Sequence, residues 1–135
     1  MKNEIKTKIE TDLKNLLNKD IIVQCNIDRV FFRCFVDLKN GENIHRVFGL
    51  ITDKGIYLRS GFTHADYRRQ GIAQLVRESI HSVLKTEFNQ VLYTNSKEFI
   101  DPEKTKEGIS PLYELWEKLV SEGKAEKEGD EYRMI

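Results

Sequence analysis

The spacing of apolar residues changes once in the first half of the chain, from a helical period to shorter runs. Ile5, Ile9, Leu13, Leu16 and Leu17 recur at helical spacing among lysines and acids, which predicts an amphipathic surface helix over 4–18. The following runs are rich in branched and aromatic residues, which predicts strands over 21–27, 30–38, 44–52 and 56–63. Turn residues at 39–43 and 53–55 separate the later strands.

The second half of the chain alternates between the two patterns. A helical period begins at Ile72 and continues to Leu84, with Arg77, Glu78, His81 and Lys85 between its apolar positions. A short buried strand is expected over 89–95 and a second helix over 112–120, with Ser110 as N-cap and Pro111 at the first helical position. A hairpin over 124–135 turns at Glu128-Gly129-Asp130. This order predicts an α/β domain in which helices pack on a mixed sheet.

Length and composition narrow the classes of function. With 135 residues the chain is expected to form a single domain. It has 22 basic and 22 acidic residues, a balance that argues against general nucleic-acid binding. No apolar run is long enough to span a bilayer and nothing resembles a signal peptide. Cys25 and Cys34 lack the spacing of a metal site and are expected to be reduced, buried residues. We therefore expect a cytoplasmic protein without a membrane segment, as a monomer or homodimer.

The segment Tyr67-Arg68-Arg69-Gln70-Gly71-Ile72-Ala73 joins a predicted strand to a predicted helix. A glycine-containing loop that opens a helix leaves several backbone N–H groups unpaired and directed outward. These donors and the positive end of the helix form a seat for phosphate, to which Arg59, Arg68 and Arg69 would add charge.

This segment resembles the acyl-CoA-binding signature of the GCN5-related N-acetyltransferases (GNAT), Gln/Arg-x-x-Gly-x-Gly/Ala. Arg68, Gly71 and Ala73 stand at its three defined positions. The resemblance covers about residues 44–135 and is strongest at 67–73. It implies that the coenzyme A pyrophosphate binds next to Arg68, on the amides of Arg69, Gln70, Gly71, Ile72 and Ala73.

The resemblance also implies a fold and an activity. The fold would be a central, mostly antiparallel sheet, splayed between two parallel strands that admit the pantetheine arm and flanked by helices. A backbone N–H at Phe62 or Thr63 would bind the thioester carbonyl, and Asn95 would contact the cofactor from the next strand. The activity would be transfer of an acetyl group from acetyl-CoA to a primary amine of a small molecule or a protein, without a metal ion.

The sequence departs from the family at several positions. Trp116 stands where the family has the tyrosine that protonates the leaving thiolate, and Tyr113, one turn earlier, is either its catalytic replacement or a packing residue. The candidates for the general base are His64, Asp66, Glu98 and Glu114. The charged segment 101–108 is either a solvated loop or a lid over the acceptor site. A single helix precedes the strands, where the family has a strand and two helices. These departures leave an alternative function, a catalytically inactive binding or regulatory protein with the same fold.

Overall fold

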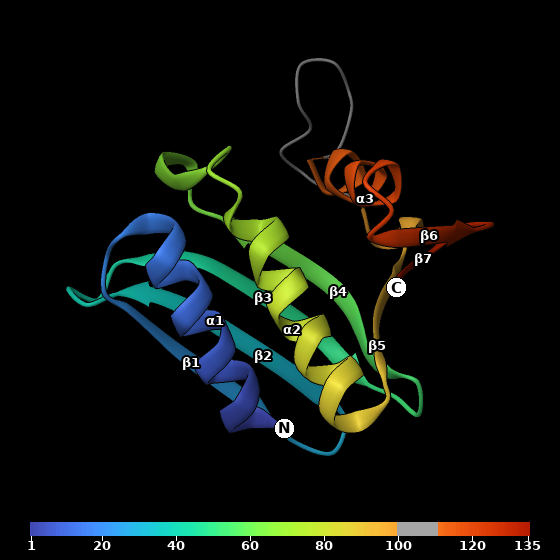
Figure 1. Cartoon of the computed structure of the whole chain (residues 1–135), viewed down its shortest axis with the longest axis horizontal. Helices are drawn as coiled ribbons and strands as arrows, with labels where there is room; N and C mark the ends of the chain where they lie inside the picture. Colours follow the sequence, from blue (N-terminus) through green and yellow to red (C-terminus); the bar gives the residue numbers. More distant parts are fainter. Residues whose placement is uncertain (100–110) are drawn as a thin grey trace.

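The computed structural model describes residues 1–99 and 111–135 of the chain. Within these ranges three α-helices and two short 3-10 turns accompany a seven-stranded sheet (Figure 1). From the amino to the carboxyl end the elements are α1 (Lys2–Leu17), β1 (Ile21–Ile27), β2 (Phe31–Leu38), β3 (Asn43–Ile51), β4 (Gly55–Thr63), η1 (Ala65–Tyr67), α2 (Ile72–Phe88), β5 (Val91–Asn95), η2 (Ser96–Glu98), α3 (Pro111–Ser121), β6 (Ala125–Glu128) and β7 (Glu131–Met134).

The predicted elements are all present, with ends within two residues of those expected from the apolar pattern, except that α2 continues four residues beyond Leu84 to Phe88. The predicted N-cap Ser110 and the charged segment 101–108, proposed as a loop or a lid, lie outside the described residues. No helix of the described part of the chain is long and apolar enough to cross a membrane.

The strands lie in the order β1-β2-β3-β4-β5-β7-β6. Neighbouring strands are antiparallel, except for β4 and β5, which run parallel. A parallel pair requires a crossover, and α2 supplies it between β4 and β5. The expected mixed α/β fold, with a mostly antiparallel sheet and one parallel pair, is confirmed.

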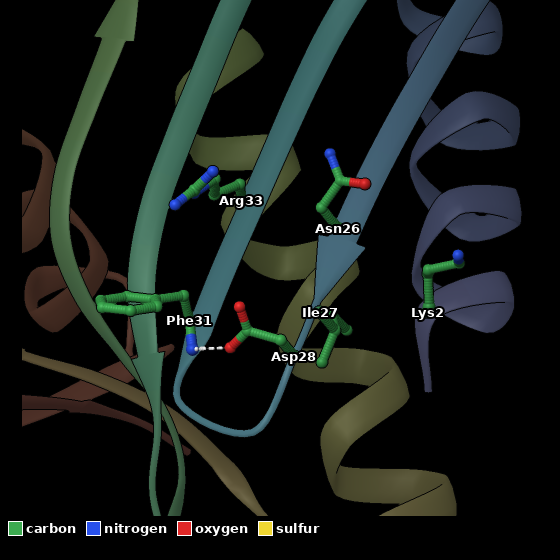
Figure 2. Close-up of a pocket in the computed structure, with 6 residues that line it drawn as sticks. All are labelled: Lys2, Asn26, Ile27, Asp28, Phe31 and Arg33. Carbon is green, nitrogen blue, oxygen red and sulfur yellow. Dashed lines mark hydrogen bonds between the residues drawn. The ribbon is translucent and has the colours of Figure 1, made fainter.

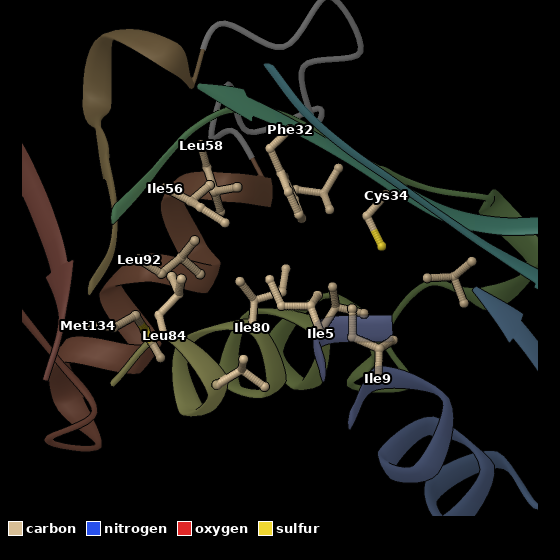
Figure 3. Close-up of a cluster of buried hydrophobic side chains, with 14 of the residues drawn as sticks. Ile5, Ile9, Phe32, Cys34, Ile56, Leu58, Ile80, Leu84, Leu92 and Met134 are labelled. Carbon is tan, nitrogen blue, oxygen red and sulfur yellow. The ribbon is translucent and has the colours of Figure 1, made fainter. Parts of the chain in front are cut away.

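The core lies between one face of the sheet and helices α1 and α2, which run side by side across it (Figure 1). From α1, Ile5, Ile9 and Leu13 are fully buried. They meet Ile80 and Leu84 of α2 and side chains of the inner sheet face in one cluster (Figure 3). Apolar burial of this kind is the main favourable contribution to folding.

Two polar residues of α2 are buried, although the sequence places them between the apolar positions of the helix. Arg77 is 1% exposed and His81 is 5% exposed. The expectation for the cysteines is confirmed, because Cys25 and Cys34 are buried free thiols. The register of β1 and β2 places them directly opposite each other, with their Sγ atoms 3.5 Å apart.

Candidate functional site

The parallel strands β4 and β5 separate soon after they meet. They pair from Gly55 and Val91 only as far as Tyr57 and Tyr93, whereas β4 continues to Thr63 along β3. One edge of β4 therefore has no partner in β5 beyond Tyr57, and an extended ligand can add hydrogen bonds to such an edge.

A β-bulge in β4 lies at the start of this open edge. Leu58 pairs with Gly49 and Ser60 pairs with Phe48, so Arg59 is an additional residue on β4. A bulge increases the local twist of a strand. The bulge at Arg59 therefore lies where β4 begins to turn away from β5.

The alternation of the strand decides which β4 amides face the open edge. The N–H of His64, just after β4, donates to the carbonyl of Ile44 in β3 at 2.9 Å. Successive residues of a strand direct their N–H groups to opposite edges. The amide of Phe62 is therefore directed toward β3, and those of Gly61 and Thr63 toward the open edge. Of the two predicted carbonyl-binding positions, Thr63 has the suitable orientation.

A narrow fissure lies between the two strands where they separate. Its walls come from β4, α2, β5, the η2 turn and α3, and consist of Leu58, Arg59, Ser60, Arg77, Thr94, Glu98, Phe99, Leu112 and Trp116. The hydroxyl of Thr94 donates to the carbonyl of Leu58 at 2.7 Å and bridges the fissure. The free volume is about 10 Å³, the room of roughly one water molecule. A ligand arm can enter only if the strands move apart.

A carboxylate lies at this fissure. Glu98 accepts a hydrogen bond from the hydroxyl of Tyr57 at 3.1 Å, and Arg59 Nε lies 3.6 Å from its other oxygen. Burial, together with the carboxylate of Glu98, raises the pKa of Tyr57 to about 12. Of the four candidate bases, Glu98 is the one that lines the fissure.

The other candidate bases lie elsewhere. His64 and Asp66 belong to the η1 turn, where His64 Nδ1 accepts from the amide of Asp66 at 3.3 Å. Their ligand atoms and that of Glu42 lie within 4.8 Å of one another, but Asp66 and Glu42 are exposed. The η1 turn explains the closeness of His64 and Asp66, and Glu42 accepts a hydrogen bond from the hydroxyl of Tyr67 at 3.4 Å. Glu114 is exposed on α3.

The predicted phosphate seat lies beyond the far end of the β4 edge. No described acceptor receives a hydrogen bond from the backbone N–H groups of residues 69–74. Gly71 caps α2 with φ of 80° and a Cβ there would point into open space, so glycine suits both the backbone and the approach of a ligand. Arg68 Nε donates to the carbonyl of Thr63 at 2.9 Å, which holds the loop against the end of β4.

The chain is similar to a known protein in fold but not in sequence. No protein-family model matches the chain and no curated protein matches it. Among solved structures it is similar to the "Putative N-Acetyl Transferase YhhK from E. coli Bound to Coenzyme A", with a TM-score of 0.54 at 10% identity over 93% of this chain and 87% of the other. The two chains therefore share a fold.

The structure also gives the positions of three residues singled out in the sequence, Tyr113, Trp116 and Asn95. Tyr113 is 40% exposed and lies beneath Lys127 of the terminal hairpin, 5.7 Å from the ring centre. It is not among the fissure residues, so the structure does not bring the predicted acid to the fissure. Trp116 lines the fissure instead and packs on Tyr132 with ring centres 5.9 Å apart. The side chain of Asn95 caps η2 by accepting from the amide of Lys97.

Sequence reasoning missed the buried polar groups behind the open β4 edge. Arg77 of α2 reaches the fissure, and His45 of β3 lies close enough to feel its charge. The ring Nδ1 of His45 is 2.8 Å from the hydroxyl of Thr63. The interruption of the α2 pattern by Arg77, between buried Val76 and Ile80, was the available signal.

A larger hollow of about 240 Å³ lies at the turn between β1 and β2, away from the fissure (Figure 2). The carboxylate of Asp28 there accepts hydrogen bonds from the amides of Val30 and Phe31 at 2.9 and 2.7 Å. The Asp28 carboxylate therefore stabilises the turn, and the hollow is separate from the place where β4 and β5 part.

Proposed function

We propose that the protein binds acetyl-CoA and transfers the acetyl group to a primary amine of a small molecule or a protein. One observation carries the proposal: the open edge of β4 leads from the fissure to a helix start whose amides, at residues 69–74, have no described acceptor. From Leu58 to Thr63 this edge is roughly 17 Å long at strand spacing. An extended pantetheine arm would lie along it, with the pyrophosphate on the amides around Gly71.

The residues at the fissure support the transfer chemistry. In the proposed complex the donor thioester lies between the strands, and Glu98 accepts the proton that the amine must lose. Holding the two reactants together contributes much of the acceleration, on the order of 7–11 kcal/mol. The role of proton donor to the thiolate, predicted for Tyr113, would require movement of α3.

A catalytically inactive binding or regulatory protein is the second candidate. Two observations favour it: Tyr113 lies outside the fissure, and the Thr94–Leu58 hydrogen bond bridges it. Coenzyme binding would then open the strands and change the shape presented to a partner, without transfer.

Coenzyme binding is tested with a matched pair of glycine variants. Gly71 and Gly123 both have positive φ, of 80° and 74°, and an added Cβ at either would meet open space. Gly71→Glu and Gly123→Glu therefore introduce the same backbone strain and charge, but only the former does so at the proposed phosphate seat. By calorimetry we expect Gly71→Glu to weaken CoA binding about 100-fold, the loss of roughly two hydrogen bonds to a charged group. Wild-type affinity in Gly71→Glu would refute the proposed seat.

Turnover is tested separately by thiol release from acetyl-CoA with a panel of primary amines. Release that depends on the amine supports the transferase. Tight CoA binding without release from any amine supports the regulatory protein, and no binding of any CoA species refutes both.

A further inference from the structure

Arg77 carries a positive charge into the protein interior, and no described residue forms an ion pair with it. Its side chain is 1% exposed. Burial lowers its pKa to about 10, and no described carboxylate offsets this effect. The guanidinium is therefore still charged at neutral pH. An unpaired buried charge destabilises a fold by several kcal/mol, so its position calls for an explanation.

The contacts of Arg77 leave part of the guanidinium unused. Nη1 donates to the carbonyl of Ala73 on its own helix at 3.0 Å. Nε has no hydrogen-bond partner among the described residues. Nη2 lies against Gly61, where an added Cβ would come within 2.5 Å of it. The glycine at position 61 therefore provides the space that Nη2 occupies.

His45, whose pKa is affected by Arg77, does not balance the charge. Burial, together with the charge of Arg77, lowers the pKa of His45 to about 3, so the imidazole is neutral. Its Nδ1 is engaged with Thr63, and its Nε2 has no described partner. Arg77 and His45 thus form a polar region in the core that contains one positive charge and no negative charge.

Two hydrogen-bond donors meet at Gly61. Its backbone N–H faces the open edge of β4, as the strand alternation requires, and the guanidinium of Arg77 packs on the same residue and lines the fissure. We propose that the Gly61 N–H and the Arg77 guanidinium together stabilise the oxyanion that forms on the thioester carbonyl during acyl transfer. This inference rests on the proposed transferase function.

The reaction requires negative charge at this place only transiently. The amine nitrogen attacks the thioester carbon and forms the C–N bond, and the carbonyl π electrons move to oxygen. When the C=O bond re-forms, the C–S bond breaks and coenzyme A leaves as the thiolate. The proton lost by the nitrogen, taken up by Glu98, is returned through solvent to the sulfur. Because the neutral carbonyl of the bound donor gains little from a cation, Arg77 would raise kcat rather than donor affinity.

The variant Arg77→Met tests this role, since methionine fills much of the same space without a charge. We expect kcat for thiol release to fall about 10²- to 10³-fold, as for other lost oxyanion donors. The Kd for CoA should stay within about 2-fold, and Tm should be unchanged or higher because a buried charge is removed. Ser79→Ala is the matched control, since Ser79 is also buried on α2 but bonds to Asp12 of α1, and it should retain wild-type kcat.

Gly61→Ala provides a second test with Arg77 intact. The new Cβ would displace Nη2 from its place, so kcat should fall at least about 10-fold. A kcat for Arg77→Met within about 3-fold of wild type would overturn the inference. A fall in kcat accompanied by losses of Tm and CoA affinity would also overturn it, because the role would then be structural. Failure of the wild type itself to release thiol would instead refute the transferase, and this inference with it.

Discussion

Removing the hydrogen bond from Thr94 to Leu58 is expected to change the stability of the protein and its affinity for CoA in opposite directions. Thr94 is 2% exposed and its hydroxyl donates to the Leu58 carbonyl at 2.7 Å across the fissure. Thr94→Val keeps the shape of the side chain and leaves that carbonyl without its donor. A buried polar group that loses its partner destabilises a protein by about 1–3 kcal/mol. For a chain of this length the Tm should fall by roughly 5–10 °C.

The same change should strengthen CoA binding. In the proposed complex, entry of the pantetheine arm requires this hydrogen bond to break, and the variant no longer has it. A saving of about 1–2 kcal/mol corresponds to an affinity roughly 5- to 30-fold higher. Thermal unfolding by circular dichroism and calorimetric titration with CoA measure the two effects on the same samples.

The matched control is Thr86→Val on α2. Its hydroxyl also donates to a carbonyl at 2.7 Å, that of Ser82, but on an exposed helix surface. We expect little change in Tm or affinity. If Thr94→Val bound CoA with unchanged or lower affinity, opening of the β4–β5 fissure would not be part of coenzyme binding.

Three further predictions concern the core. The pKa of His45 is lowered from 6.5 to about 3, so the unfolded state gains a proton first as the pH falls. The contribution of His45 to the free energy of unfolding is therefore fully present above about pH 6.5 and decreases below it, by about 2.5 kcal/mol at pH 4.5. In denaturant unfolding, His45→Gln should not show this decrease. Trp116→Ala should lower the free energy of unfolding by about 3–5 kcal/mol, seen as a lower urea midpoint, whereas an unchanged midpoint would contradict the packing on Tyr132. Cys25 and Cys34 should react with Ellman's reagent only after unfolding, and rapid reaction of the native protein would contradict their burial.

Local patterns were sufficient to predict the elements of this fold. Each strand and helix follows from the spacing of apolar residues within its own segment, as in β1 and α1, where one face is buried and the other exposed. The role of Gly71 at the start of α2 was also predictable, because the backbone conformation that ends a loop and begins a helix is a local property.

The contacts at the fissure were not predictable in the same way. Thr94 and Leu58 are far apart in the chain, and their hydrogen bond depends on where β5 stops following β4. Tyr113 was predicted to be a catalytic residue from its place one turn before Trp116. The direction of its ring depends on how α3 packs against the terminal hairpin. That packing cannot be read from the sequence of the helix alone.

The amino-acid sequence by itself determined the order and type of the elements and the glycine cap that begins α2 at Gly71, since both arise from neighbouring residues. Tertiary structure alone decided that Arg77 is buried against Gly61 and that Glu98 reaches the open edge of β4. These placements depend on the register of β3 with β4, the bulge at Arg59 and the crossover through α2. Burial and charge compensation are properties of the assembled sheet and helices, because they depend on residues that only folding brings together.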